Sequence, residues 1–437
     1  MKVLKFGGTS VGSAQRMKEV AKLITNERNI VVLSAMSGTT NSLVEISDYL
    51  YKKNPDGANE VISALFQKYV AHIQELYATE EYKQKAKELI THHFDYIRSF
   101  SKDLFTLFEE RIVLAQGELI STGMMNLYLN ECGFKSVLLP ALDYMRTDKN
   151  AEPDLAYIKE HLKNMLAANA EADLFITQGY ICKNAYGEVD NLQRGGSDYS
   201  ASLVGAAIDA TEIEIWTDID GMHNNDPRVV ENTRPVRQLH FDEAAELAYF
   251  GAKILHPTCI LPAKLGNIPV RLLNTMQPDA PGTLICNEFE RGSIKAVAAK
   301  ENITSIQIKS GRMLLATGFL RKIFEIFENY QTPIDMITTS EVGVSLTVDS
   351  TKHLTEILDD LKKYGRVSVH SDMVIICVVG DLSWNNVGYE SKIISAMHDI
   401  PIRMISYGGS NYNVSLLVKS EDKKRSLQAL SDHLFNN

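Results

Sequence analysis

Short apolar runs that alternate with helical patterns dominate the first 290 or so residues. Turn-forming Gly, Asn, Ser or Asp residues bound each run, and the clearest runs are Val3–Phe6, Ile30–Leu33, Leu174–Thr177, Ile213–Trp216 and Ile268–Leu272. Near-continuous apolar strands separated by helices are typical of a mainly parallel sheet whose two faces are covered. We therefore predict an α/β domain over residues 1–290, an open sheet between helical layers. Its ligands should lie at the carboxyl ends of the strands.

From about residue 42 to residue 115 the pattern becomes helical throughout. Apolar side chains recur at three- and four-residue spacing from Val61 to Leu76, after a turn at Asn54–Gly57. We predict a helical insertion in the α/β domain, with its charged residues on a solvated face.

The pattern changes again after Pro281–Thr283, which we interpret as a domain edge. Beyond it, strand-like runs flank helical runs twice, over residues 303–348 and 374–418. We predict a second region over residues 300–437, built from two small α+β units packed side by side.

Composition excludes several classes of protein. With 45 Lys and Arg against 55 Asp and Glu, the net charge of −10 disfavours broad nucleic-acid binding, which needs a basic surface. The five cysteines are scattered, without the spacing of a zinc site or a disulfide framework. We expect no signal peptide, because the apolar run at the N-terminus is too short for one, and no apolar run of about 18 residues suggests a membrane span. We expect a cytoplasmic protein.

Two glycine turns are candidates for ligand binding. In the first, Lys5 precedes Gly7-Gly8 where a strand passes into a helix. Glycines let the backbone approach a ligand closely, and a helix N-terminus suits phosphate. In the second, Arg194 precedes Gly195-Gly196-Ser197-Asp198, and an Arg fork suits a carboxylate. An ordinary strand–turn–helix junction and simple helix capping are the alternatives.

Three further segments carry single candidates. A polar loop follows the strand ending at Trp216 and could hold a nucleotide, although its Asp-Gly and Asp-Pro pairs are also plain turn formers. Lys253 lies at a helix–loop junction, where a lone lysine is usually a surface residue. Glu118 could be an ordinary exposed helix residue, and His256 before a proline is more simply structural than catalytic.

The order and identity of these segments together resemble the aspartokinases, members of the amino acid kinase family, over essentially the whole chain. The residues that carry the resemblance are Lys5–Val11, Ser34–Asn41, Gly117-Glu118, Arg194–Asp198, Trp216–Asp218, Asp226–Arg228 and Gly251–Lys253.

The resemblance implies ATP-dependent phosphorylation of the β-carboxylate of L-aspartate, the first step of lysine, threonine and methionine biosynthesis. The ordinary pKa of that carboxylate is about 3.9, so it is ionised at neutral pH and needs no general base. Catalysis should then be positioning and charge neutralisation. Magnesium would arrive with ATP, bound by phosphates and waters, without a dedicated protein site.

The resemblance also assigns roles to residues. Lys5 and Lys253 would stabilise the transferring phosphoryl group, and Asp198 would orient both lysines. Glu118 would bind the substrate ammonium and Arg194 its α-carboxylate, assisted by Thr40, Gly195, Gly196 and Ser197. The nucleotide would be bound by Lys5, Gly7, Gly8, Thr217, Asp218, His223, Arg228, Lys253 and Ile254. The chain departs from the family at Asp190–Gln193, where many members have a threonine-rich stretch and a glycine, and at His223, where some have an aromatic residue.

The C-terminal units resemble the paired ACT domains of aspartokinases, which are ferredoxin-like. By that likeness the first unit spans about 312–372, and residues 301–311 join 373–437 to form the second. An amino-acid effector would be bound by Met313, Ala316, Gly318, Phe319, Asp335, Thr339 and Ser340, with Asp335 meeting its ammonium group. The stretches Ile334–Val342 and Ile402–Gly409 look most like lysine-inhibited members, although Ala316 replaces a serine found in some of them.

Two other functions stay open at this point. A kinase for another carboxylate, such as glutamate, shares the first glycine turn but lacks the paired ACT region and the Arg194–Asp198 arrangement. A catalytically inactive amino-acid sensor would keep the fold, but loss of Lys5, Lys253 or Asp198 would be expected, and all three are present. We further expect a homodimer or tetramer formed through the ACT domains. The chain ends after the second unit, so no homoserine dehydrogenase half is expected.

Overall fold

The chain divides into two compact units. The computed structural model describes residues 1–25, 27–102, 104–192, 195–251, 255–311 and 317–435. Unit 1 comprises Met1–Met222 and Leu255–Asn287, and unit 2 comprises His223–Ile254 and Glu288–Asn437.

The segment 223–254, which the sequence analysis placed with the α/β domain, therefore groups with the C-terminal residues. Its contacts explain why. The His240 ring stacks on Tyr412 at 5.7 Å, and the Asn225 amide donates to the Leu427 carbonyl at 3.0 Å.

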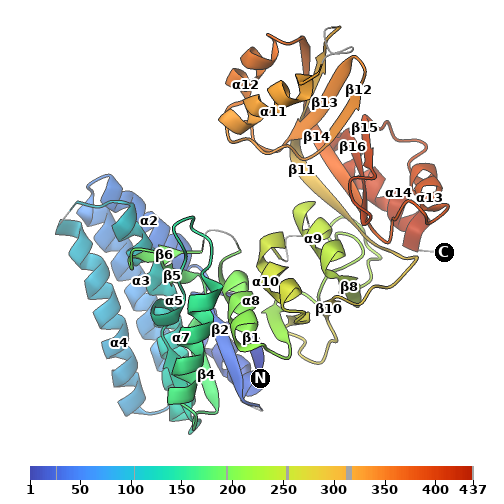
Figure 1. Cartoon of the computed structure of the whole chain (residues 1–437). Coiled ribbons are helices and arrows are strands. Elements are labelled where there is room, and N and C mark those ends of the chain that lie inside the picture. The colour runs from blue at the N-terminus through green and yellow to red at the C-terminus, as the bar shows by residue number, and fades with distance from the viewer. Residues whose placement is uncertain (26, 103, 193–194, 252–254, 312–316, 436–437) are drawn as a thin grey trace. The chain divides into compact units, whose positions relative to one another are not determined.

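Unit 1 is built on a mainly parallel sheet (Figure 1). Its strands follow the order β3 (Ser136–Leu139), β4 (Leu174–Gln178), β2 (Asn29–Leu33), β1 (Lys2–Phe6), β7 (Ile213–Thr217), β9 (Val270–Asn274) and β10 (Thr283–Cys286). Neighbours pair in parallel except β9 and β10, which are antiparallel. All five residues of β2 and of β4 are buried, as expected for strands covered on both faces. The predicted sheet is confirmed.

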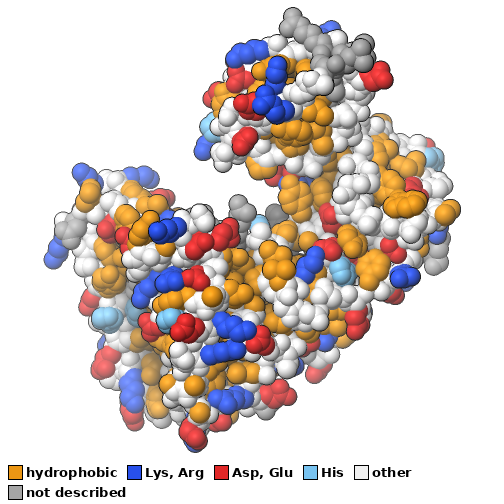
Figure 2. All heavy atoms as spheres, in the orientation of Figure 1, with side chains coloured by type: hydrophobic (Ala, Val, Ile, Leu, Met, Phe, Trp, Pro, Cys, Tyr) orange, Lys and Arg blue, Asp and Glu red, His pale blue; other side chains and the backbone are white. Residues whose placement is uncertain are grey.

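Helices surround this sheet and continue into a bundle. They are α1 (Ala14–Ile24), α2 (Thr39–Tyr51), α3 (Pro55–Leu76), α4 (Glu80–Ser99), α5 (Leu107–Glu131), α6 (Ala141–Tyr144), α7 (Leu155–Ala168), α8 (Gly196–Ile208) and α10 (Leu261–Leu265). In the predicted insertion, α3, α4 and α5 run alongside one another (Figure 1). Tyr69 and Phe94 are fully buried there, with ring centroids 5.8 Å apart. Figure 2 shows charges of both signs mixed over α4 and α7, which is typical of a solvated face.

Small elements complete unit 1. Strands β5 (Ile181–Lys183) and β6 (Val189–Asn191) form a separate antiparallel pair. Short 3₁₀ turns, η1 (Phe100–Lys102) and η2 (Pro257–Ile260), precede α5 and α10.

Unit 2 contains a six-stranded antiparallel sheet. Its order is β12 (Ile337–Ser340), β13 (Gly343–Val348), β11 (Ile294–Lys309), β14 (Arg366–Gly380), β16 (Asn413–Lys419) and β15 (Met404–Tyr407). Helices α11 (Phe319–Asn329) and α12 (Leu354–Leu361) pack on one half, and α13 (Tyr389–Ala396) and α14 (Lys423–Phe435) on the other (Figure 1). The 3₁₀ turn η3 (Ser420–Asp422) leads into α14, and β8 (Gln238–His240) leads into α9 (Phe241–Tyr249).

The long strands β11 and β14 each serve both α+β repeats. Residues Ile303–Lys309 pair with β13 and with the first part of β14, inside the first repeat. Residues Ile294–Lys300 pair with Ile375–Gly380, inside the second repeat. The strand that completes the second repeat is therefore 294–300, and the prediction that 301–311 does so is wrong. Each repeat otherwise has the ferredoxin-like strand order expected of it.

None of the helices in the described ranges combines the length and hydrophobicity that crossing a bilayer requires.

Candidate active site

The end of β1 brings backbone close to a neighbouring loop. The Ser37 amide donates to the Gly8 carbonyl at 3.1 Å, and a Cβ added to Gly8 would lie only 2.7 Å from the Ala35 carbonyl oxygen. A side chain at position 8 would therefore push the loops apart. This close approach explains why the predicted first glycine turn has glycine at position 8. The turn exposes backbone at the carboxyl end of a parallel strand.

The second glycine turn opens α8. Gly195 has φ +68°, and a Cβ there would lie 1.7 Å from the Cys259 Sγ, so only glycine fits. Asp198, in the first turn of α8, forms an ion pair with the Lys5 Nζ at 2.8 Å. Two predicted catalytic residues that lie far apart in the chain are therefore in direct contact. Lys5 itself is only 8% exposed, so its ammonium is held rather than free in solvent.

A pocket of about 440 Å³ lies between these two turns and the loop after β2. Five of the predicted site residues line it: Gly8, Thr40, Glu118, Gly196 and Ser197. The Ser34 hydroxyl donates to the Ser197 hydroxyl at 2.9 Å and so links the loop to α8. The pocket is large enough for a small amino acid beside a phosphate group.

Glu118 is the buried acid of this pocket. It lies within α5 and is 5% exposed, and one carboxylate oxygen accepts from the Ala35 amide at 3.2 Å. Burial raises the pKa of Glu118 to about 7, although the backbone hydrogen bond opposes the shift. Among the residues that the structure describes, no cationic side chain forms an ion pair with it. A bound ammonium group would supply that missing charge.

The remaining predicted site residues do not all line the pocket. Gly7 follows β1, and a Cβ there would lie 3.5 Å from the Lys5 Nζ. Thr217 ends β7 and its carbonyl accepts from the Thr275 amide at 2.8 Å, while Asp218 is exposed beside it. Arg194, Lys253 and Ile254 lie outside the described residues.

Two predicted nucleotide-binding residues belong to unit 2. His223 is hydrogen-bonded to the Thr233 hydroxyl at 2.9 Å. The Arg228 guanidinium forms two hydrogen bonds with the Asp226 carboxylate at 2.9 and 2.8 Å. Nucleotide binding by these two side chains stays a prediction.

Tyr180 is a pocket residue that the sequence analysis did not single out. It follows Gly179 immediately after β4, has φ +67°, and its amide donates to the Ser200 hydroxyl at 2.9 Å. The available signal was positional, because Gln178-Gly179-Tyr180 lies at the carboxyl end of a predicted strand.

No group of His, Cys, Asp and Glu side chains with the geometry of a metal site occurs in the described part of the chain.

The predicted effector carboxylate has an internal partner. Asp335 has a side chain only 1% exposed, and its Oδ1 lies 2.6 Å from the Lys300 Nζ and 3.1 Å from the Tyr249 hydroxyl. Lys300 also pairs with Asp349 at 2.9 Å, and its ammonium lies 4.3 Å from the Tyr249 ring centroid. Burial raises the pKa of Asp335 against the opposing effect of Lys300. Burial lowers the pKa of Lys300, but its two carboxylate partners outweigh this and raise it overall.

Other predicted effector residues flank Asp335 or open a helix. Gly318 precedes α11 with φ +80°, and Phe319 packs in the same apolar cluster as Ile337. Thr339 and Ser340 end β12, where the Ser340 hydroxyl donates to the Gly343 carbonyl at 3.4 Å. Met313 and Ala316 lie outside the described residues.

Comparison with known proteins agrees with this geometry. The family model described as the amino acid kinase family matches residues 1–274, and one for an ACT domain matches residues 376–434. The chain is 34% identical over 447 residues to the lysine-sensitive aspartokinase 3 of Escherichia coli (strain K12), covering 99% of each chain. It is also 34% identical over 466 residues to the chloroplastic aspartokinase 3 of Arabidopsis thaliana, covering 99% of this chain and 81% of that one.

Solved structures show the same likeness. The R-state crystal structure of E. coli aspartokinase III with aspartate and ADP superposes with a TM-score of 0.85, at 33% identity and full coverage of both chains. The T-state structure of the same enzyme with lysine and aspartate gives a TM-score of 0.82 at 34% identity, covering 100% of this chain and 99% of that one.

Proposed function

The chain belongs to the aspartokinases of the amino acid kinase family, and from that premise we propose that its pocket phosphorylates the β-carboxylate of L-aspartate with ATP. The observation that carries the proposal is the Lys5–Asp198 ion pair at 2.8 Å, beside a pocket whose buried acid, Glu118, has no described cationic partner. Asp198 fixes the Lys5 ammonium in place as a positive charge for a phosphoryl group, and the buried acid suits an ammonium group.

The reaction needs no proton transfer. One β-carboxylate oxygen attacks the γ-phosphorus, the bond from that phosphorus to the bridging oxygen breaks, and ADP leaves with the electron pair. Because the nucleophile is already an anion, the barrier comes from bringing two anions together. Lys5 neutralises the phosphoryl oxygens, and Asp198 keeps the Lys5 ammonium in place. We expect Lys253 to act with them.

Aspartate is held at the other end of the pocket. Glu118 accepts its ammonium group, which lowers the pKa of Glu118 and restores the carboxylate form. Arg194 would take the α-carboxylate, with Ser197 and Thr40 as hydrogen-bonding neighbours. The glycines at 7, 8, 195 and 196 let backbone amides approach the phosphates, and the closeness of Gly8 to Ala35 fits such a cradle. Thr217, Asp218, His223 and Arg228 would contact the nucleotide.

Magnesium would bind through the ATP phosphates and water. There it would neutralise phosphate charge, a role that needs no dedicated cluster of protein ligands.

Regulation is the second part of the proposal. We infer that L-lysine binds the first α+β repeat and inhibits the enzyme, with its ammonium directed to Asp335, and that the enzyme works in the cytoplasm. The likeness to the lysine-sensitive relative supports the choice of effector. A homodimer or tetramer through the ACT repeats is expected.

A coupled ADP-release assay with ATP, magnesium and L-aspartate tests the activity, with L-glutamate as the competing substrate. Hydroxylamine trapping should give aspartyl hydroxamate, which identifies an acyl phosphate product. Lys5→Ala should remove more than about 99% of kcat, because a lost phosphate-binding charge typically costs about 3 kcal/mol. A folded, ATP-binding protein that releases no ADP would instead be an amino-acid sensor.

A further inference from the structure

Helix α3 makes two side-chain contacts with the loop that follows β2. The Lys68 Nζ donates to the Ser37 carbonyl at 2.9 Å, and the next residue, Tyr69, shares a buried hydrogen bond with the Thr39 hydroxyl at 2.9 Å. Ser37 and Gly38 both line the candidate pocket. The helical insertion therefore contacts the segment that lines the pocket.

We propose that Lys68 and Tyr69 are positioning residues for aspartate binding, and that the Lys68 ammonium also places a positive charge at the rim of the pocket. The inference rests on the proposed function, since it assigns the anion to the aspartate substrate. It gives the insertion a part in the reaction beyond enlarging the core.

The loop is fixed on its other sides by contacts with the turn after β1 and with α5. The Ser37 amide donates to Gly8, the Ser121 hydroxyl donates to the Ser34 carbonyl at 2.8 Å, and Glu118 accepts from Ala35. These contacts hold the part of the loop nearest the strands. Lys68 and Tyr69 hold its far part, where the chain turns into α2 and presents Thr40 to the pocket.

If Lys68 served only the stability of the fold, its position would be unfavourable. Gly38 precedes α2, has φ +82° and offers no side-chain cap, and a Cβ on it would lie 3.4 Å from the Lys68 Nζ. A cation beside a helix N-terminus faces the positive end of the helix dipole. Among the described residues Lys68 forms no ion pair, and its charge helps burial to lower the pKa of His72 to about 4. An anion in the pocket would relieve this unbalanced positive charge.

The chemistry points to a carboxylate of the substrate. An ammonium group has three donors, and the Ser37 carbonyl uses one of them. Glu118 lines the same pocket and takes the opposite charge. A zwitterionic amino acid with a second carboxylate would therefore find a negative wall at Glu118 and a positive rim at Lys68.

Tyr69 acts through Thr39 rather than through charge. Its side chain is fully buried between helices of the insertion, and its hydroxyl reaches the first residue of α2. Removing that hydroxyl leaves the buried Thr39 hydroxyl without its partner and loosens the turn that orients Thr40.

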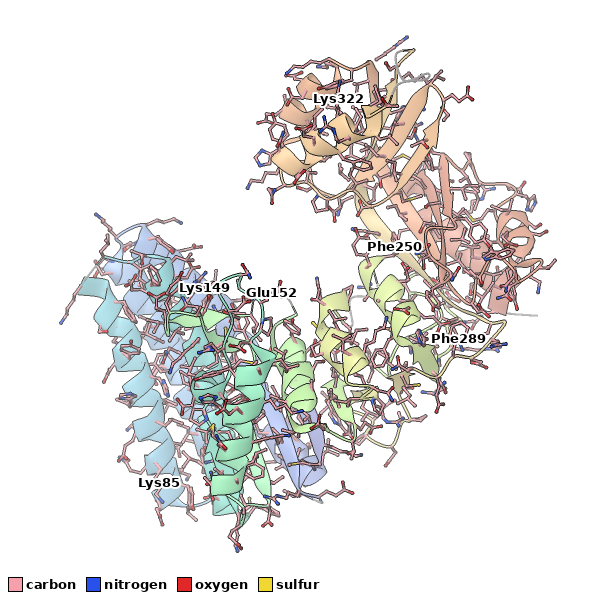
Figure 3. All side chains as sticks on the ribbon, viewed as in Figure 1. Lys85, Lys149, Glu152, Phe250, Phe289 and Lys322 are labelled. Carbon is pink, nitrogen blue, oxygen red and sulfur yellow. The ribbon has the colours of Figure 1, made fainter. Side chains whose placement is uncertain are left out.

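The test compares steady-state kinetics of the full-length wild type with Lys68→Ala, Lys68→Arg, Tyr69→Phe and a control, Lys85→Ala. Lys85 is a lysine on the outer surface of α4, paired with Glu81 at 2.6 Å (Figure 3). We expect Lys68→Ala to raise KM for aspartate about tenfold, with KM for ATP and kcat within about twofold. Lys68→Arg should recover most of the loss, Tyr69→Phe should raise the same KM about threefold, and Lys85→Ala should match the wild type.

The dependence of this KM on salt is a second measurement, and a merely structural role of Lys68 would not affect it. The difference between Lys68→Ala and wild type should shrink as ionic strength rises, because a rim charge is screened. A Lys68→Ala enzyme with the aspartate KM of Lys85→Ala would overturn the role of Lys68 alone. Equal rises in KM for ATP and aspartate, or no recovery in Lys68→Arg, would show a merely structural lysine. A wild type without turnover of aspartate would overturn the proposed function and this inference with it.

Discussion

Two buried carboxylates, Glu118 in unit 1 and Asp335 in unit 2, are each proposed to receive the ammonium group of an amino acid, yet their surroundings differ. Glu118 has one backbone amide as its described partner, and burial raises its pKa to about 7. The Asp335 side chain is as deeply buried but already contacts the Lys300 ammonium at 2.6 Å.

Under the proposed function, this difference separates the substrate site from the effector site. At Glu118 the ligand brings the first countercharge, so ligand binding and ionisation of the acid are coupled. At Asp335 the protein supplies its own ammonium, so an effector must compete with Lys300 or share the carboxylate with it. Substrate binding should therefore depend on pH near neutrality, and effector binding on the strength of an internal ion pair.

The largest effect is expected for Glu118→Gln. Loss of the charged hydrogen bond to the ammonium group costs about 3 kcal/mol, so kcat/KM for aspartate should fall on the order of a hundredfold. Glu88→Gln, an exposed change on α4, should have no effect. Steady-state kinetics of both variants check this, and near-wild-type kinetics in Glu118→Gln would remove Glu118 from the site.

The same variant should be more stable than the wild type at pH 8. The folded pKa of Glu118 is raised from 4.5 to about 7, so the folded state holds the proton more tightly than the unfolded state. Stability is therefore lost as pH rises between these values, by about 3 kcal/mol for a shift of this size. Denaturant unfolding of Glu118→Gln at pH 8 should recover much of that loss, whereas at pH 4 the two proteins should differ little.

The pH dependence of the wild type is the next largest effect. Only ionised Glu118 can accept the ammonium, so kcat/KM for aspartate should fall about tenfold per pH unit below about pH 7. Glu118→Gln should lack this limb. A profile that stays flat to pH 5.5 in the wild type would show that Glu118 is already ionised and would erase the contrast with Asp335.

Asp335→Asn tests the regulatory side of the comparison. The concentration of L-lysine that halves activity should rise about tenfold, since the charged acceptor is lost. Asp349→Asn is the matched control, because Asp349 is more exposed and its loss leaves the Asp335–Lys300 pair intact. Equal responses of the two variants to L-lysine would contradict a direct role for Asp335.

The smallest effect is expected for Lys300→Met. Removing the competing ammonium should lower the half-inhibiting concentration of L-lysine about threefold, because the effector no longer competes with Lys300 for the buried carboxylate. Thermal unfolding should show a lower Tm, since Asp335 stays buried without its partner. Weaker inhibition in this variant would mean that Lys300 helps to bind the effector instead of competing with it.

The sheet of unit 1 could be predicted because its strands are buried on both faces and so read as continuous apolar runs. The first half of β11 in unit 2 could not be predicted in this way. Ala296–Ala299 is rich in alanine, which has low strand propensity, so the first half of β11 gave no strong signal. Ile303–Ile308 gives a strong strand signal, and it was therefore assigned to the wrong repeat.

The sequence points to the residues of the candidate site, but not to most of the contacts that they make. Lys5 and Asp198 could be named from two glycine turns, and the structure places them 2.8 Å apart. The partner of Asp335 could not be foreseen, because Lys300 lies 35 residues earlier with no local pattern to join them. Lys68 was hidden for another reason, since a lysine on a helix is ordinarily a solvated residue.

The interleaving of the two α+β repeats fixes an order of assembly. The first repeat has all of its strands once the first part of β14 has been made, whereas Ile294–Lys300 waits for Ile375–Gly380. During synthesis the earlier half of β11 is thus an unpaired strand attached to a finished repeat. Such an edge invites pairing with other chains until Ile375–Gly380 has been made. A truncation that removes β16 and α14 leaves Met373–Val379 of β14 without its second neighbour, so it should aggregate rather than yield an unregulated enzyme.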